Sequence, residues 1–286
     1  MAERVLGAGY PLRVFNRTEA KSAALVAAGA VASASVAELA SACDAVLLCL
    51  TDTRAVEEVL FGPEGIVAST AVGTLIIDLS TTQPMQARAM AERLKRDHGM
   101  ALVDAPVSGG PTGARAGTLA VMVGGETPDV ERARPLLECF ARQVVHMGPP
   151  GCGQAAKACN QMINFANSAA IAEAMNLAAR FGMDPALLPQ ALSGGFADSG
   201  FLRHFGPLMA SGAYAGAGNS RMTLKDLKIV EDLAQATGSA TPVIGLIASL
   251  YRLLFAQGFE RDGVAGLMRL YETTGQPDAP ERSSRG

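Results

Sequence analysis

Lys157 is the only charged side chain between Gly151 and Ser168, in a segment otherwise built of small, apolar and amide residues. At about 100° per residue, a helix over this segment places uncharged polar side chains on one face with the lysine, and Asn167 at its edge. These side chains are Gln154, Asn160, Gln161, Asn164 and Ser168. A solvated helix face normally carries Glu, Lys and Arg, whereas amides suit a wet cleft or a buried hydrogen-bond network. The pattern indicates a catalytic lysine supported by amides; the alternative is an ordinary polar outer face.

A second candidate, Asn16-Arg17-Thr18, follows a short strand-like segment, Leu12 to Phe15. At this place a dinucleotide-binding fold distinguishes a ribose 2′-hydroxyl from a 2′-phosphate. An acidic residue would accept a hydrogen bond from the hydroxyl, whereas an arginine with two small polar neighbours suits the phosphate of NADP. The alternative is a surface arginine beside Thr18 as a helix N-cap.

Two more strand-like segments end in residues that could do chemistry. Ser80-Thr81-Thr82 follows Leu75–Leu79, and these residues either contact a nicotinamide or cap the next helix. Ser108-Gly109-Gly110 comes shortly after Ala101–Ala105. Its glycines expose backbone N–H groups beside a hydroxyl, which suits a carboxylate, although the same spacing also fits a tight turn.

The first half of the chain alternates strand-like and helix-like segments that would position these residues. Ala45–Leu50 is a continuous apolar run of the kind that a parallel strand buried on both faces requires. Further strands are predicted over 75–79, 101–105, 119–123 and 143–146, and helices over about 18–28, 54–60, 84–97 and 128–140. This alternation predicts an α/β fold with a Rossmann-like doubly wound sheet, whose ligands bind at the carboxyl ends of its strands.

From Gly151 onward the strand-like segments stop. Helices are predicted over about 152–181, 185–193, 200–210, 220–237, 241–257 and 263–270. We therefore predict a nucleotide-binding domain over residues 1–149 and an all-helical substrate and dimerisation domain over 150–273. The tail, 274–286, is rich in Pro, Ser and charge, and we expect it to be disordered.

The composition excludes several classes of protein. With 286 residues, 49% hydrophobic and 18% charged, the chain is long enough for two globular domains. A net charge of -3 gives no basic surface for nucleic acid, and no apolar run approaches the roughly 20 residues that span a membrane. Five cysteines without CxxC spacing, and no signal sequence, predict reduced, buried thiols and a cytoplasmic location. Three scattered histidines give no metal-binding spacing.

Six stretches of the sequence now carry a resemblance to a known family. They are Val14–Thr18, Asp78–Thr81, Asp104–Gly110, Gly117–Gly125, Gly151–Asn160 and Leu224–Leu227. In this order and spacing they resemble the β-hydroxyacid dehydrogenase family. That family includes 3-hydroxyisobutyrate dehydrogenases and tartronate semialdehyde reductases, and it is related to 6-phosphogluconate dehydrogenase. The resemblance covers nearly the whole chain.

The resemblance implies a role for several residues. Lys157 is the expected catalytic lysine, and Ser108-Gly109-Gly110 is expected to hold the substrate carboxylate with help from Asn160. Lys225 is expected near the nicotinamide and the substrate; the alternative is a helical charge pair with the residue after it. Gln161 stands where the 3-hydroxyisobutyrate enzymes tend to have Asn, which favours the semialdehyde reductase side.

The amino terminus departs from the family pattern. Members begin with a strand and a turn of the form Gly-Leu-Gly-x-Met-Gly-x-x-Met-Ala, and this sequence begins at what resembles the final Met-Ala. Gly7-Ala-Gly9 precedes a strand instead of following one, so it cannot replace that turn, and Gly9 better fits the end of a helix. We therefore expect the first strand and the glycine loop to be missing and the true start codon to lie upstream.

Together these observations predict an enzyme that transfers a hydride between a nicotinamide cofactor and a small 3-hydroxy acid or its semialdehyde. NADP is the preferred cofactor, and NAD is possible. The lysine would supply both a proton and a positive neighbour for the developing alkoxide. One alternative is a dehydrogenase of a longer sugar acid such as threonate. Another is a catalytically impaired dimerisation or binding protein. Apolar C-terminal helices, including Ala248–Phe255, predict a homodimer or homotetramer.

Overall fold

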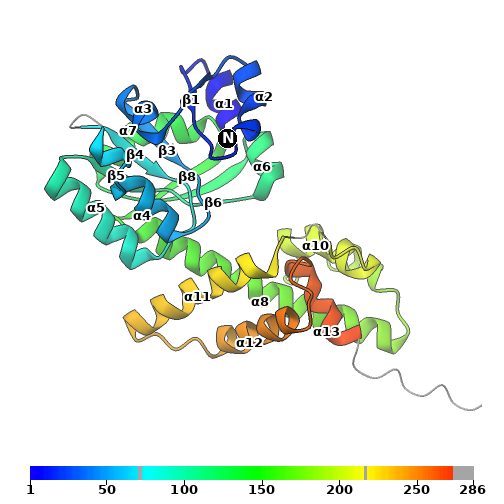
Figure 1. Ribbon diagram of the computed structural model, residues 1–286. Coiled ribbons are helices and arrows are strands. Elements are labelled where there is room, and N and C mark those ends of the chain that lie inside the picture. The colour runs from blue at the N-terminus through cyan, green and yellow to red at the C-terminus, as the bar shows by residue number, and fades with distance from the viewer. Residues whose placement is uncertain (70–72, 216–217, 273–286) are drawn as a thin grey trace, which may run out of the picture. The chain divides into compact units, whose positions relative to one another are not determined.

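A computed structural model describes residues 1–69, 73–215 and 218–272 of the chain (Figure 1). The chain divides into two compact units, Met1–Ala158 and Cys159–Gly286, and each is described by itself. The division falls within one long helix, whereas the domain boundary predicted from the sequence precedes that helix. The tail over 274–286, expected to be disordered, lies outside the described residues.

The first unit alternates strands and helices, which confirms the predicted α/β class. Its α-helices are α1 (Ala2–Gly7), α2 (Ala23–Ala27), α3 (Val36–Ser41), α4 (Thr53–Phe61), α5 (Pro84–His98), α6 (Gly110–Ala116) and α7 (Thr127–Glu138). Its strands are β1 (Arg13–Val14), β2 (Val31–Ala32), β3 (Ala45–Leu48), β4 (Leu75–Asp78), β5 (Ala101–Asp104), β6 (Val107–Ser108), β7 (Leu119–Gly124) and β8 (Ala141–Gly148). Two short 3-10 helices are η1 (Glu19–Lys21) and η2 (Ile66–Ala68). Gly9, with φ of 90°, follows α1, as expected for a residue at a helix end.

The strands form two sheets. β1 pairs in parallel with β2, whereas the main sheet has the order β3-β4-β5-β7-β6, with β8 paired to β7. β3, β4 and β5 are parallel, β7 is antiparallel to β5, and β8 is parallel to β7. The first predicted strand therefore lies outside the main sheet, because no described strand joins β1 to β3.

Both faces of the main sheet are covered, which accounts for the continuous apolar runs of its strands. Leu75 and Ile77 pack in one core cluster with residues of α7, whereas Ile76, which points to the other face, packs with residues of α4 and α5. The sheet is thus fixed on both sides. Its parallel strands end with Asp78 and Asp104 side by side in register.

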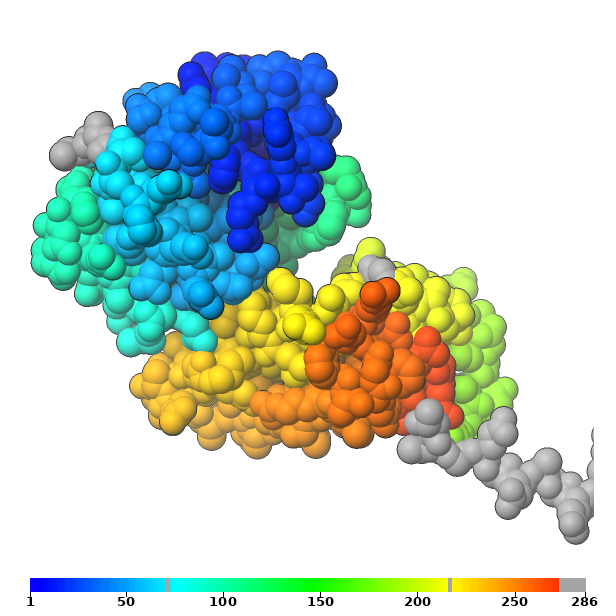
Figure 2. All heavy atoms as spheres, in the orientation of Figure 1, coloured from blue at the N-terminus to red at the C-terminus, as the bar shows by residue number. Residues whose placement is uncertain are grey.

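The second unit is all-helical in its described residues, as predicted. α8 (Cys152–Phe181) enters it and is followed by η3 (Pro185–Leu187), α9 (Leu188–Ala191), α10 (Gly200–Ser211), α11 (Ser220–Thr237), α12 (Pro242–Ala256), η4 (Val264–Leu267) and α13 (Met268–Glu272). The yellow atoms of α11 pack against the orange atoms of α12 in Figure 2. In the core, the buried hydroxyl of Tyr251 lies 3.0 Å from Ser168 Oγ. No helix of the described residues is long and apolar enough to cross a membrane.

Candidate active site

The amino terminus of α8 is fixed by an aspartate from the sheet. Asp104, the last residue of β5, is 1% exposed, and its two carboxylate oxygens accept the N–H groups of Gly151 and Gln154, each at 2.8 Å. A helix cannot satisfy its first N–H groups by itself, and its positive end favours a carboxylate. Sequence reasoning did not select this residue. The sequence signal that could have identified Asp104 is an acidic residue at the end of a buried strand, followed later in the chain by a long helix that begins with Gly-x-Gly.

Two glycines allow α8 to approach the sheet this closely. A Cβ on Gly153 would lie 2.5 Å from the Asp104 carbonyl oxygen and 2.6 Å from that of Met122. A Cβ on Gly124 would lie 2.5 Å from Asp104 Oδ1. Neither position can take a side chain without displacing the backbone or the aspartate. The start of α8 is therefore held rigidly against β5 and β7.

Gln154 connects α8 to the segment that follows β4. Its Nε2 donates to the Ser80 carbonyl oxygen at 2.8 Å, and its Oε1 accepts from the Thr82 N–H at 3.0 Å. Ser80 Oγ in turn accepts from the Leu50 N–H at 2.8 Å. The N-cap of α5 is Gln83, so the capping alternative for Ser80-Thr81-Thr82 is wrong. The cofactor role of Ser80 and Thr81 stays a prediction.

Lys157 lies one turn after Gln154 on the same face of α8 and is 8% exposed. Its Nζ donates to the Val107 carbonyl oxygen at 3.0 Å. This carbonyl directly precedes Ser108-Gly109-Gly110, in which the glycines have φ of 127° and 64°, the region that favours glycine. The structure therefore brings the predicted catalytic lysine to the start of the predicted carboxylate cradle, from segments 50 residues apart.

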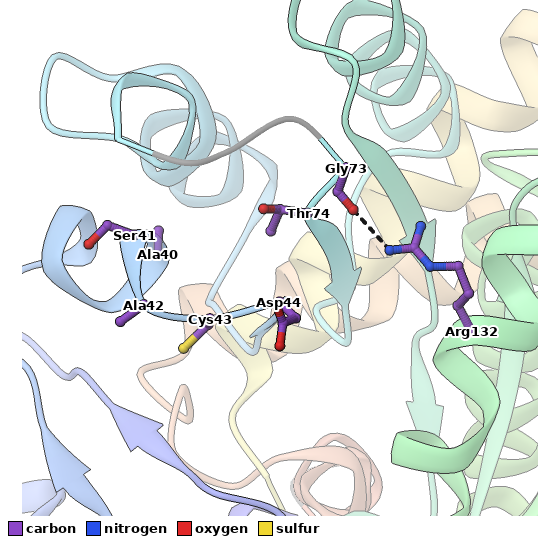
Figure 3. Close-up of a pocket in the computed structure, with 8 residues that line it drawn as sticks. All are labelled: Ala40, Ser41, Ala42, Cys43, Asp44, Gly73, Thr74 and Arg132. Atoms are coloured by element: carbon purple, nitrogen blue, oxygen red, sulfur yellow. Dashed lines mark hydrogen bonds between the residues drawn. The ribbon is translucent and has the colours of Figure 1, made fainter.

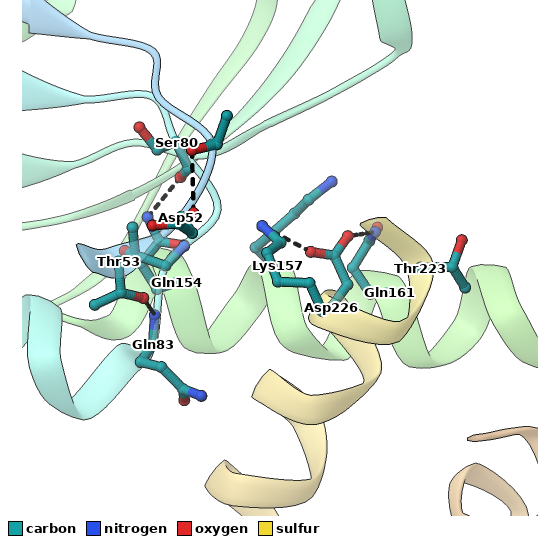
Figure 4. A network of polar contacts seen from close by, with 12 residues as sticks. Asp52, Thr53, Ser80, Gln83, Gln154, Lys157, Gln161, Thr223 and Asp226 are labelled. Carbon is teal, nitrogen blue, oxygen red and sulfur yellow. Dashed lines mark hydrogen bonds and ion pairs between the residues drawn. The ribbon is translucent and has the colours of Figure 1, made fainter. Parts of the chain in front are cut away.

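In the second unit, the predicted residues form a network of their own. Gln161 Nε2 donates to Asp226 Oδ2 at 2.6 Å (Figure 4). Gln161 Oε1 accepts from Asn160 Nδ2 at 2.8 Å. Lys225 Nζ lies 3.1 Å from Asp226 Oδ1, so the charge pair considered as the alternative for Lys225 is present. Sequence reasoning missed that Asp226 links α8 to α11. The ligand contacts of Asn160 and Lys225 stay predictions.

Asn16, Arg17 and Thr18 are exposed in the loop after β1. Asn16 Oδ1 accepts from the Thr18 N–H at 3.0 Å, which forms a local turn. Thr18 is the N-cap residue of η1 but makes no side-chain capping bond. The position of Thr18 therefore fits the N-cap alternative, but its side chain makes no capping hydrogen bond.

The prediction for the cysteines is correct in one part and wrong in another. All five are free, but none is buried: Cys49 and Cys159 are exposed, and the other three are half-buried. Cys49 lies just beyond the last residue of β3, and Cys159 lies on an outward side of α8, so an apolar neighbourhood in the sequence did not mean burial.

His146 has a structural role, because its Nε2 lies 2.9 Å from the carbonyl oxygens of Gly125 and Gly148. Over the described residues, no cluster of metal-binding side chains is found.

A pocket of about 400 Å³ opens at the other end of the main sheet (Figure 3). Cys43 and Asp44, which precede β3, and Gly73 and Thr74, which precede β4, line it together with Arg132. Ligands of doubly wound sheets bind at the carboxyl ends of the strands, whereas this pocket lies at the amino ends. It contains none of the candidate site residues.

Asp104 gives the stability of the protein an unusual dependence on pH. Burial raises its pKa from 3.8 to about 6, against the effect of the backbone N–H groups that it accepts. The Asp104 carboxyl therefore stays protonated up to a higher pH in the folded chain than in the unfolded chain. As pH rises from about 4 to 6, this difference lowers the free energy of unfolding by about 3 kcal/mol in all. We expect this decrease to vanish in Asp104→Asn, which is also destabilised at neutral pH because an amide N–H₂ faces a backbone N–H.

Urea unfolding at several pH values, followed by circular dichroism, measures the difference between the two proteins. Asp232→Asn, at a half-exposed position of α11 in the second unit, makes the same substitution away from Asp104 and is the matched control. If the free energy of unfolding changes with pH equally in the wild type and in Asp104→Asn between pH 4 and 6, the prediction is wrong.

Comparison with known proteins agrees with this geometry over nearly the whole chain. The family described as the NAD binding domain of 6-phosphogluconate dehydrogenase matches residues 1–148. The family described as NAD-binding of NADP-dependent 3-hydroxyisobutyrate dehydrogenase matches residues 151–271. The chain belongs to the β-hydroxyacid dehydrogenase family. As a member of it, the protein is a hydroxyacid dehydrogenase with NAD(P)-binding domains.

Individual relatives of this β-hydroxyacid dehydrogenase cover most of its length. The chain is 37% identical to the NAD-dependent L-serine dehydrogenase of Pseudomonas aeruginosa, over 96% of this chain and 94% of the relative. It is 35% identical to the 2-hydroxy-3-oxopropionate reductase of Escherichia coli, over 82% and 80%. A solved structure of Mycobacterium tuberculosis 3-hydroxyisobutyrate dehydrogenase with L-serine aligns with a TM-score of 0.83 and 31% identity, over 94% and 93%. The last alignment also confirms the predicted fold.

Proposed function

We propose that this β-hydroxyacid dehydrogenase transfers a hydride between NADP and a small 3-hydroxy acid or its semialdehyde, with Lys157 as general acid and base. One observation carries the proposal: the buried Lys157 Nζ lies 3.0 Å from the carbonyl oxygen that directly precedes Ser108-Gly109-Gly110. The serine hydroxyl and the first N–H groups of α6 suit a carboxylate. A cation beside them suits the alcohol or aldehyde oxygen of the same small molecule.

The names of the relatives support one carbon skeleton for the substrate. L-serine, 3-hydroxyisobutyrate and the reduced form of 2-hydroxy-3-oxopropionate all have the form HOCH₂–CH(X)–COO⁻, where X is an ammonium, a methyl or a hydroxyl group. We infer that the substrate of this chain shares this skeleton, with a primary alcohol two carbons from the carboxylate. Gln161, in place of Asn, favours the reductase side, on which X is a hydroxyl.

The residues of the chain would divide the work of this reaction. The nicotinamide, when bound, supplies or accepts the hydride. In reduction, Lys157 donates a proton to the aldehyde oxygen and stabilises the charge that develops there; in oxidation, neutral Lys157 accepts the hydroxyl proton. Ser108-Gly109-Gly110, with Asn160, would fix the carboxylate and thereby orient the reacting carbon.

The residues after β1 fit the adenosine end of NADP by the chemistry of their donors. The guanidinium of Arg17 can bind a phosphate through two parallel hydrogen bonds, and Asn16 and Thr18 add an amide and a hydroxyl. None of the three is the acid that an NAD-binding fold places against the 2′-hydroxyl.

Initial rates with both cofactors test the proposal. The substrates are 2-hydroxy-3-oxopropionate for reduction, and L-serine, 3-hydroxyisobutyrate and glycerate for oxidation, with threonate as the longer comparison. We expect NADP(H) to support turnover of at least one three-carbon-chain substrate with a kcat/KM above that of threonate. Turnover of threonate alone, or of none of these compounds, would refute the proposed substrate class.

Arg17→Ser should weaken the binding of NADPH by roughly 10- to 100-fold, because one charge-assisted contact contributes about 1.5–3 kcal/mol. NADH binding should stay unchanged, since NADH lacks the 2′-phosphate. Titration followed by the fluorescence of the reduced nicotinamide measures both dissociation constants. Lys21→Ser, an exposed cation in the same loop region, is the matched control. Equal losses for NADPH and NADH would show that Arg17 does not contact the 2′-phosphate.

We also propose a cytoplasmic location. The five cysteines are free thiols, whereas structural disulfides are typical of oxidising compartments.

A further inference from the structure

Gln154 joins two segments of the first unit that carry predicted reaction residues. Its amide bonds twice to the backbone of the turn after β4, to the Ser80 carbonyl oxygen through Nε2 at 2.8 Å and to the Thr82 N–H through Oε1 at 3.0 Å. A carbonyl only accepts and a backbone N–H only donates, so these two partners allow a single orientation of the amide. Lys157 follows one turn later on the same face of α8.

The same turn is also attached to the segment that follows β3. Ser80 Oγ accepts from the Leu50 N–H at 2.8 Å. The Gln83 N–H donates to Thr53 Oγ1 at 3.0 Å (Figure 4). These two bonds hold the turn to the strand side, whereas the amide of Gln154 holds it to the helix. A change at position 154 therefore alters the attachment of the turn to α8 and leaves its attachment to the sheet in place.

We propose that Gln154 is a positioning residue, which fixes the turn Ser80-Thr81-Thr82 relative to Lys157 so that hydride transfer and proton transfer act on the same carbonyl group. The inference rests on the proposed function and on the predicted contact of this turn with the nicotinamide. Gln154 itself would touch neither cofactor nor substrate, because it is 1% exposed and both ends of its amide bond to backbone. It would act through geometry, since a displacement of about 1 Å at a reacting group can lower a rate about 100-fold.

Gln154→Glu gives the sharpest test, because glutamic acid has nearly the shape of glutamine and can titrate. The protonated acid reproduces both bonds, with its O–H donating to the carbonyl of the turn and its other oxygen accepting from the N–H. The ionised form only accepts, so it repels that carbonyl. Burial favours the protonated acid, nearby carboxylates favour it further, and a nearby lysine opposes it. The titratable groups on the surrounding elements are Cys49, Asp52, Asp78, Asp104 and Lys157.

The activity of Gln154→Glu should therefore depend on pH in a way that the wild type does not. Its kcat should be close to that of the wild type at about pH 5.5, and should fall relative to the wild type by roughly 10- to 100-fold as pH rises to about 9.5. KM should stay unchanged, because the predicted carboxylate cradle lies on another segment. Gln154→Met keeps the size but loses both bonds, so its kcat should be about 100-fold lower at every pH.

Gln143→Glu, at an exposed position of β8, is the matched control and should follow the wild type at every pH. Thermal unfolding across the same pH range checks that each variant is folded. A folded Gln154→Met with the kcat of the wild type would overturn the inference. So would a ratio of Gln154→Glu to wild-type kcat that does not change between pH 5.5 and 9.5.

Hydrogen exchange with NADPH alone separates this inference from the proposed reaction, since it needs no turnover. In the wild type, NADPH should slow amide exchange in peptides that cover residues 78–84 and also in those that cover 151–158, because Gln154 connects the two segments. In Gln154→Met, the slowing should remain in the first segment and be lost in the second. Equal slowing of both segments in Gln154→Met would show that Gln154 does not couple them and would overturn the inference, even if the reaction itself is as proposed.

Discussion

Replacing Lys157 with alanine is expected to lower kcat by about 10²- to 10⁴-fold, the contribution of a positioned general acid and base. The loss should be similar for every accepted substrate, because the proton transfer is common to all of them. Binding of NADPH should persist, since the residues proposed to hold its 2′-phosphate lie in the loop after β1. Stopped assays with single turnovers, together with a fluorescence titration of NADPH, separate the two effects.

Lys228→Ala is the control for this experiment. Lys228 is also a lysine on a helix, but its side chain is exposed and pairs with Asp232, so its loss should leave kcat unchanged. Thermal unfolding checks that Lys157→Ala keeps the fold after losing the bond to the Val107 carbonyl. A folded Lys157→Ala protein with near-normal kcat would contradict the assignment of Lys157 as the catalytic residue.

Long periodic segments made most of the fold predictable from the sequence. The buried strand at 45–50 and the long helix at 152–181 were recognisable because their apolar patterns extend over many residues, and the structure places β3 and α8 there. β2 and β6 were missed because two residues cannot show a period. The helix expected over 18–28 is divided into η1 and α2, and the Ser22 hydroxyl bonds back to the Glu19 carbonyl oxygen at this break.

The residues of the candidate site that share one face of a helix could be predicted from the sequence. The residues whose role depends on a contact with the sheet could not. Lys157 and Gln154 share a face of α8, so helical periodicity grouped them correctly. Asp104 and Gly153 escaped notice because their meaning depends on a contact between segments about 50 residues apart. Asp226 was missed as a partner of Gln161 for the same reason. Periodicity reports which residues share an element, whereas the contact of two elements depends on the fold.

Gly153→Ala is expected to lower the free energy of unfolding of the first unit by about 3 kcal/mol or more. The added methyl group would clash with backbone atoms, which cannot move aside as a flexible side chain could. The new Cβ would lie within 2.7 Å of three backbone atoms, from Asp104, Met122 and Gly124. Relief requires α8 to move away from β5 and β7, which would also stretch the two hydrogen bonds that Asp104 accepts and shift Lys157. Urea unfolding followed by circular dichroism measures this, since the chain has no tryptophan to report by fluorescence.

Gly245→Ala provides the matched control, because Gly245 lies inside α12 and a Cβ there would meet no atom within 4 Å. That variant should be stabilised by about 0.5–1 kcal/mol, the gain from removing a glycine from a helix interior. The two substitutions add the same methyl group to a helical glycine, so their opposite signs would isolate the close approach of α8 to the sheet as the cause. If Gly153→Ala instead unfolds at the same urea concentration as the unchanged protein, then α8 is free to shift along the sheet. In that case the position of Lys157 beside the Val107 carbonyl would not be fixed by the packing described above.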